Sequence, residues 1–319
     1  MESGSPQDDG LLVDPVRAEV IHVPTEGESG PAALLPESVE PERSPSPMAV
    51  ALRHPAARVG LVVIAALVVF SYIGPLIWSA SPNDTDLLVI LQPPSSVHPF
   101  GTDDVGRDVL ARMMVGGQVS LNIGVAAAAL GCAIGVVYGA ISGFAGGRLD
   151  SVMMRFVDGM LAIPVLVLLI VLAAAFRPNQ LLLILVISLT SWLIPARLIR
   201  AGTLSMKSQD FIKASQAMGS TSTRTLRRHV LPNSVGIIVV NATFQVADAI
   251  LLVAYLSFLG LGIPPPTATW GGIMSTGISY INEQAWWLIY FPGLAILLAV
   301  VAFNYLGDTV RDAYDVTAR

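Results

Sequence analysis

Long apolar stretches alternate with short polar segments from residue 59 to residue 306. An α-helix rises about 1.5 Å per residue, so roughly 20 apolar residues cross the ~30 Å hydrocarbon core of a membrane. We expect six such helices, at residues 59–78, 120–144, 151–176, 181–199, 234–262 and 286–306. The pattern predicts an all-α, polytopic membrane protein with six transmembrane helices.

An acidic N-terminal segment precedes the first apolar stretch. Residues 1–50 are rich in Pro, Glu, Ser and Gly, and hold ten acidic residues against two arginines. Such a composition cannot bury enough apolar surface to form a core, so we expect a disordered tail. We assign the first transmembrane helix and an outer segment with a short amphipathic helix to residues 51–119, the other five helices to residues 120–307, and a C-terminal tail to residues 308–319.

The composition agrees with a membrane protein. Hydrophobic residues make up 53% of the chain and charged residues 13%, and the mean hydropathy is +0.66. Soluble domains are about a quarter charged. The net charge of -5 comes from the acidic tail, because the rest of the chain holds sixteen basic and thirteen acidic residues. This balance gives no indication of nucleic-acid binding.

Basic residues are distributed unevenly between the two sides of the predicted membrane protein. With a cytoplasmic N-terminus, thirteen of the sixteen Lys and Arg residues after residue 50 fall in cytoplasmic segments, and only Arg107, Arg112 and Arg177 fall outside. Cytoplasmic loops typically carry this excess. We therefore expect a multi-pass cell-membrane protein with both termini in the cytoplasm.

Three acids of the outer segment have two interpretations. Asp103, Asp104 and Asp108 either cap the short helix and pair with Arg107 and Arg112, or contribute to a metal site. Because no further ligand cluster or histidine stands at ligand spacing, capping and pairing are favoured.

Small residues and prolines shape the next three spans. Gly131, Gly135, Gly139 and Gly143 are spaced four apart and form a stripe on one face of the second span. In lipid, such a stripe lets helix backbones approach closely, so we expect this helix to be buried in the bundle or at a subunit contact. Pro164 should kink or loosen the third span, and we expect a break near Pro195 in the fourth; the cysteine Cys132 has no partner for an internal disulfide.

The fifth span carries polar residues on one face. Asn241, Gln245 and Asp248 stand at i, i+4 and i+7. Polar side chains at membrane depth face a bundle interior or a water-filled path. Two interpretations stay open: the three residues line a translocation path, or they hydrogen-bond to neighbouring helices.

A polar and basic segment, residues 208–233, lies in a cytoplasmic loop of residues 205–232 between the fourth and fifth spans. Its pattern predicts two short helices joined at Gly219, where a left-handed residue ends the first. The first helix has one face of Phe211, Ala214, Ser215 and Met218, and also carries Lys213 and Ala217; the second carries Arg224, Arg227, Arg228, His229 and Leu231 and stops at Pro232. A helix, turn and helix among membrane spans suggests a docking element.

No motif for catalysis or cofactor binding is recognisable. The chain has no Gly-x-x-x-x-Gly-Lys-Ser/Thr phosphate loop and no His-Glu-x-x-His zinc motif, and its four histidines have no ligand spacing. We therefore expect no enzymatic activity, no metal and no cofactor in this chain.

The order of residues in the loop is similar to a known family. Lys213-Ala214-Ser215, Gly219 and Leu231-Pro232 resemble the EAA loop of ABC-importer permeases, although Lys213, Ser215 and His229 depart from its usual Glu, Ala and apolar residue. Residues 98–112 and 257–271 resemble signatures of dipeptide and oligopeptide permeases.

The resemblance implies a type I ABC-importer permease fold over about residues 50–315. It implies that the loop forms a coupling helix that docks on an ATPase subunit. The implied partners are a homologous second permease subunit, two cytoplasmic ATP-binding subunits that hold ATP and Mg, an extracytoplasmic solute-binding protein, membrane lipid, and a di- or oligopeptide substrate. Alternatives are a permease of the same family for nickel or another small solute, and an ion-coupled secondary carrier.

Overall fold

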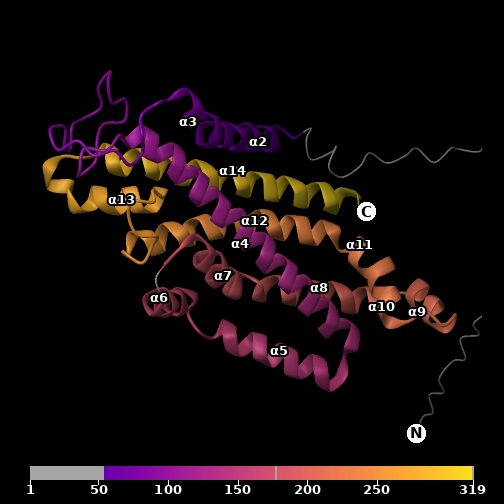
Figure 1. Cartoon of the computed structure of the whole chain (residues 1–319). Helices are drawn as coiled ribbons and strands as arrows, with labels where there is room; N and C mark the ends of the chain where they lie inside the picture. Colours follow the sequence, from indigo (N-terminus) through magenta and orange to yellow (C-terminus); the bar gives the residue numbers. More distant parts are fainter. Residues whose placement is uncertain (1–53, 177, 318–319) are drawn as a thin grey trace, which may run out of the picture. The chain divides into compact units, whose positions relative to one another are not determined.

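The computed structural model describes residues 54–176 and 178–317. The predicted acidic tail, residues 1–50, lies outside the described residues. The described residues form helices and connecting loops, and the structure contains no β-strand among them, only an isolated bridge between Thr102 and Asp108 (Figure 1). The predicted all-α architecture is confirmed for this part of the chain.

The first span is an uninterrupted helical run of 23 residues. It comprises α2 (Pro55–Val68), a π-helical turn (Val69–Ile73) and α3 (Gly74–Ile77). Pro75 has no backbone N–H, so the carbonyl of Ser71, four residues earlier, loses its usual helical partner. The Gln118 side-chain Nε2 donates to that carbonyl at 2.8 Å. This bond ties the first span to the next helix.

The central helix is α4 (Val109–Ala145), which contacts α8, α12 and α7 along its length (Figure 1). Asp108 caps its N-terminus, accepting from the Ala111 N–H at 2.8 Å. The short helix predicted before residue 120 is the first part of α4 in the structure. Asp103 lies in the preceding turn, and the helix runs without a break from Val109 into the membrane span.

The glycine stripe of α4 faces α7 (Gln180–Ser191) and α8 (Leu193–Lys207). An added Cβ would lie 2.5 Å from the Ser191 hydroxyl at Gly131, 2.6 Å from the Trp192 carbonyl oxygen at Gly135, 2.3 Å from the Ala196 carbonyl oxygen at Gly139 and 2.8 Å from the Thr203 Cβ at Gly143. These distances leave no room for a side chain. The glycines allow the two backbones to touch.

Two of the predicted spans are bent pairs of helices. In the third, α5 (Gly147–Leu161) and α6 (Val165–Ala175) meet at 79° around Pro164. In the fourth, α7 and α8 meet at 42°. The described residues thus contain four helices able to cross a membrane, or up to six if each bent pair is one span. The predicted break at Pro164 is confirmed.

The C-terminal part consists of α12 (Val235–Phe258), α13 (Trp270–Ser279) and α14 (Trp287–Thr317), with a short 3-10 turn (Ile281–Glu283) before the last helix. Here α14 contacts α12, α2 and α13. The helix α14 continues past residue 308, where we expected the C-terminal tail to begin, as far as Thr317. Val310 and Ala313 are buried against α12, which explains why the helix persists.

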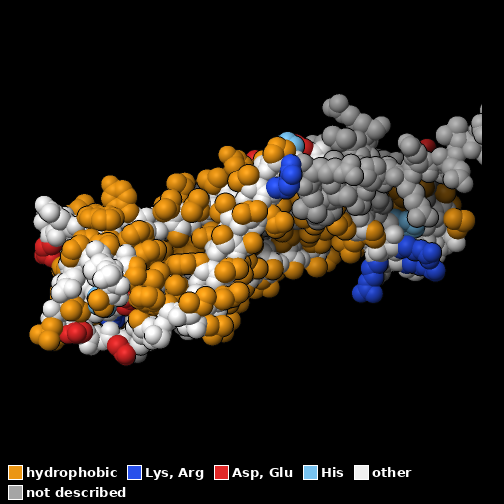
Figure 2. Space-filling model, turned by 90° about the horizontal axis from the view of Figure 1, so that it is seen from above, with side chains coloured by type: hydrophobic (Ala, Val, Ile, Leu, Met, Phe, Trp, Pro, Cys, Tyr) orange, Lys and Arg blue, Asp and Glu red, His pale blue; other side chains and the backbone are white. Residues whose placement is uncertain are grey.

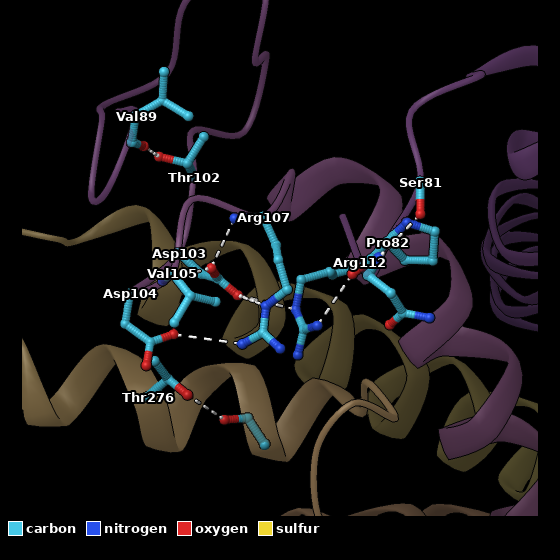
Figure 3. Close-up of polar contacts among 12 residues, drawn as sticks. Ser81, Pro82, Val89, Thr102, Asp103, Asp104, Val105, Arg107, Arg112 and Thr276 are labelled. Carbon is cyan, nitrogen blue, oxygen red and sulfur yellow. Dashed lines mark hydrogen bonds and ion pairs between the residues drawn. The ribbon is translucent and has the colours of Figure 1, made fainter. Parts of the chain in front are cut away.

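Buried charges fasten the outer segment to the start of α4 (Figure 3). The Asp103 carboxylate accepts from Arg107 Nε at 2.7 Å and pairs with Arg112 Nε at 3.3 Å, while Asp104 pairs with Arg107. Arg112 also donates to the Pro82 carbonyl oxygen at 3.2 Å. The predicted pairing of these acids with the two arginines is confirmed.

Two tryptophans of the following outer region are core residues. Trp270 is 0% exposed and Trp287 3%. The Trp270 indole N–H donates to the Met113 carbonyl oxygen at 3.0 Å, and the Trp287 indole N–H donates to the Thr102 carbonyl oxygen at 3.0 Å. Only Trp286, at 48%, remains exposed.

Because α4 and α8 approach closely, a single methyl group added at their contact should destabilise the protein. Gly139→Ala would place a Cβ 2.3 Å from a backbone oxygen, so we expect destabilisation of about 1–3 kcal/mol. Gly159→Ala is the matched control, because nothing lies within 4 Å of its Cβ position, and alanine favours the helix. Thermal unfolding of the purified proteins in detergent measures both; equal midpoints would contradict the packing argument.

Candidate functional site

A large cavity lies between the bent helices and α12. Its volume is about 1020 Å³, and its walls come from the α5–α6 junction, α7, α8, α12 and the inner part of α14. Most of the wall is apolar, with Leu, Ile, Val and Phe side chains. Asn241, Gln245 and Asp248, the three polar residues predicted to share a face, all line it.

The break between α7 and α8 follows from a proline. Pro195 provides no N–H for the Ser191 carbonyl four residues earlier, and its ring crowds that turn. The chain bends at Trp192, and the predicted break near Pro195 is confirmed, although α8 then continues to Lys207, beyond the expected end at residue 199. The Gln245 Nε2 donates to the Ser191 carbonyl oxygen at 3.0 Å.

The three polar residues of α12 therefore have different surroundings. Gln245 is buried, bonds α7 through its amide nitrogen, and its Oε1 has no hydrogen-bond partner among the described residues. Asn241 is half-buried, and Asp248 is exposed to the cavity. Gln245 thus bonds a neighbouring helix, and all three residues border the cavity.

Ion pairs hold α5 beside α8. The Asp150 carboxylate accepts from Arg200 Nε at 2.5 Å and Nη2 at 2.6 Å, and from the Ser142 hydroxyl of α4. Asp158 pairs with Arg197.

A second candidate site is the polar segment between α8 and α12. The structure places α9 at Asp210–Ala217, followed by Gly219 with φ of +87°. The Ser220 N–H donates to the Ser215 carbonyl oxygen at 3.1 Å, a bond that closes the end of the helix. The predicted first helix and left-handed glycine agree with this geometry.

The second helical part is more irregular than the sequence indicated. Thr221 caps α10 (Ser222–Thr225), which passes into a π-helical turn (Leu226–Val230) and a last turn, α11 (Leu231–Asn233). The helical turns do not stop at Pro232, because a proline fits the first turn of a helix, and the chain enters α12 directly through Ser234.

Most of the predicted docking residues are on the surface. Exposed side chains are Phe211, Lys213, Ala214, Ala217, Met218, Arg224, Arg227, Arg228 and Pro232; Ser215, His229 and Leu231 are half-buried. Met218 is 82% exposed, while Ile212 and Val230 are buried and anchor the segment. The Phe211 and His229 rings lie edge to face, 6.0 Å apart, linking its two halves.

Exposed basic side chains are concentrated toward this end of the described chain. Figure 2 shows hydrophobic side chains over most of one face, with Lys and Arg side chains toward the end that holds α9 and α10 and several Asp and Glu side chains at the opposite end. The segment of residues 210–233, which we call the docking segment, therefore presents an apolar, protruding Met218 beside exposed arginines.

The partners of several important residues could not be recognised in the sequence, although Gln245 itself belongs to the predicted polar face. Gln118 and Gln245 act on carbonyls freed by prolines in other helices, and Arg200 binds Asp150 across 50 positions. A proline inside an apolar run was the available clue, since it implies a carbonyl in need of a donor. Which glutamine supplies the donor depends on the packing.

Comparison with known proteins identifies the class of protein that this fold and cavity represent. Residues 135–318 match the family described as binding-protein-dependent transport system inner membrane component, and residues 50–94 match the N-terminal TM domain of oligopeptide transport permease C. The chain belongs to this family of inner-membrane transport permeases. The resemblance inferred from the loop and the two signatures is thus confirmed.

Several similar relatives are named as peptide permeases. The chain is 40% identical to the oligopeptide transport system permease protein OppC of Bacillus subtilis, over 82% of this chain and 86% of the relative. It is 38% identical to the dipeptide transport system permease protein DppC of the same organism, over 84% and 83%. A Brucella suis protein named in general terms as a peptide permease is 45% identical, over 84% and 89%. Such permease components are not themselves catalytic.

The bond between α12 and the α7 break gives a testable prediction. Gln245→Leu leaves the Ser191 carbonyl without its donor, which should lower the free energy of unfolding by about 1–3 kcal/mol. Asn241→Leu is the control, because Asn241 makes no hydrogen bond in the described structure. Thermal or denaturant unfolding in detergent compares the two variants.

A double-mutant cycle tests the cause of that loss. In a Pro195→Ala background, a new backbone N–H at position 195 can bind the Ser191 carbonyl, so Gln245→Leu should cost less than it does in the parent protein. An unchanged cost would show that Gln245 stabilises the protein by some other contact.

Proposed function

We propose that this chain forms one half of the translocation path of an ATP-driven importer of di- or oligopeptides, and that the docking segment couples it to separate ATPase subunits. The observation that carries the proposal is the connection between the two candidate sites. The docking segment lies directly between α8 and α12, and both helices line the cavity. Movement of the segment would therefore be transmitted to the cavity wall.

The relatives support the cargo. Two of them are named as oligopeptide and dipeptide permeases. A cavity of about 1020 Å³ with a largely apolar wall accommodates side chains of varied shape. The assembly would contain a second, homologous permease subunit, two cytoplasmic ATP-binding subunits that hold ATP and Mg, and an extracytoplasmic solute-binding protein. Nickel or another small solute is the alternative cargo.

The exposed docking residues support the coupling role. An apolar side chain such as Met218 gains most when a partner's groove covers it, and the arginines beside it favour an acidic partner surface. When the ATPase subunits close on ATP, they would displace the docking segment. The cavity walls formed by α8 and α12 would then shift between outward and inward openings. The cytoplasmic position of the segment is part of this proposal.

Two substitutions test the docking role. Proline fixes φ near -65°, so Gly219→Pro is incompatible with the φ of +87° at this turn. Met218→Asp places a charge where an apolar contact is proposed. We expect each variant to insert in the membrane, to recover at least tenfold less ATPase subunit in a membrane pull-down, and to lose peptide uptake.

The matched control is Arg148→Glu, which alters an exposed basic residue in the first turn of α5, outside the docking segment. It should recover the ATPase subunits as the parent does. Normal recovery with Gly219→Pro and Met218→Asp would refute the docking role. Uptake by the chain alone in vesicles, without any ATPase, would instead support an ion-coupled carrier. Uptake of nickel but not peptide would redefine the cargo.

A further inference from the structure

Asp248 is an unpaired carboxylate on the wall of the cavity. It stands near the middle of α12, and its side chain is exposed to the cavity. Within residues 54–176 and 178–317 it makes no hydrogen bond and no ion pair. An ionisable group at membrane depth is costly, so it typically faces a polar path or a partner of opposite charge.

The other acids near the bent spans differ from Asp248. Asp150 is bound by Arg200, and Asp158 pairs with Arg197. In the outer segment, Asp103 and Asp104 are likewise paired with arginines. Each of these four structural acids is therefore paired with an arginine of the protein. Asp248 lacks one, which leaves its carboxylate available to a cation that enters the cavity.

Arg311, the other charged residue of the cavity wall, is too distant to neutralise Asp248. The helices α12 and α14 run antiparallel, since Gly236 packs against Tyr314 and Gly307 against Thr243. This register places Arg311 level with about residue 239 of α12. At about 1.5 Å per residue, Asp248 lies some 13 Å farther along the helix. The cavity thus has separate acidic and basic positions along its length.

We propose that Asp248 binds the protonated amino group of the transported peptide. This inference rests on the proposed function. A free peptide carries an α-amino group that is largely protonated at neutral pH, whatever its side chains. A carboxylate recognises that group through a charge-assisted hydrogen bond. The apolar wall around it makes no demand on side-chain identity, so one carboxylate provides recognition common to peptides of different sequence.

The test measures uptake of tri-alanine and of N-acetyl-tri-alanine by the complete transporter in proteoliposomes. Acetylation removes the charge of the amino group and leaves the rest of the peptide unchanged. We expect Asp248→Asn to lower the ratio of free to acetylated uptake by about tenfold, and Asp248→Glu to retain most of the ratio. Every variant works with the same binding protein. Its own preference for free amines therefore has the same effect on each variant's ratio and does not change the comparison between variants.

The matched control is Asp158→Asn, which removes a carboxylate that does not line the cavity. It should leave the free-to-acetylated ratio at the parent value, whatever its effect on rate. A ratio unchanged by Asp248→Asn, or an equal loss of both peptides in Asp248→Asn and Asp248→Glu, would overturn the inference. Uptake of neither peptide by the parent transporter would contradict the proposed peptide cargo itself, rather than the role of Asp248.

A second measurement does not depend on transport. In a Cys132→Ala background, Leu252→Cys places a thiol one helical turn from Asp248 on the cavity wall. The carboxylate should raise the ratio of labelling rates for a cationic over an anionic thiosulfonate reagent by severalfold, and Asp248→Asn should abolish that increase. Equal ratios with and without the carboxylate would exclude an ionised Asp248 that is accessible to cations.

Discussion

Hydrocarbon offers no hydrogen-bond partner to a backbone carbonyl, and this constraint explains how the helices are joined. A proline in a span frees the carbonyl four residues earlier, which must find a donor within the protein. Two serine carbonyls, Ser71 and Ser191, are freed in this way, and a glutamine from another helix binds each: Gln118 of α4 and Gln245 of α12. At each of these prolines, a hydrogen bond to the freed carbonyl thereby connects two helices.

The second of these connections shapes the candidate translocation path. Because Gln245 is directed at the Ser191 carbonyl, the face of α12 that carries it is turned toward the α7–α8 break. Asn241 and Asp248, each about one turn away from Gln245 on that face, then border the cavity. The 79° bend around Pro164 provides the opposite wall, since α6 departs sharply from α5. Two prolines thus create both the space and its polar lining.

Much of this architecture could be predicted from the sequence, because apolar run length and proline position act locally. The helical class, the breaks at Pro164 and Pro195 and the pairing of Asp103 with arginines followed from such signals. The helix α9 and the left-handed Gly219 that follows it were also predicted from local signals. The burial of Trp270 and Trp287 was not, because it depends on contacts more than 150 positions apart. The extension of α14 beyond residue 308 likewise depends on packing against α12.

Both ends of the docking segment lead into helices with different attachments. At one end, α8 is held against α4 by the glycine contacts and by Lys207, which donates to the Phe144 carbonyl oxygen at 2.7 Å. Because these contacts leave little freedom, α4 and α8 behave as one unit.

Beyond its first turn, where Asp150 binds Arg200 of α8, the attachment of α5 is weaker. It contacts the bundle through a small apolar cluster around Val157 and Trp192 and through ion pairs, of which Asp158–Arg197 is exposed. Exposed pairs contribute little stability and re-form easily. A force applied at the docking segment would therefore move the rigid α4–α8 pair relative to α5. The cavity lies between these parts, so their displacement changes its opening while the helices themselves stay intact.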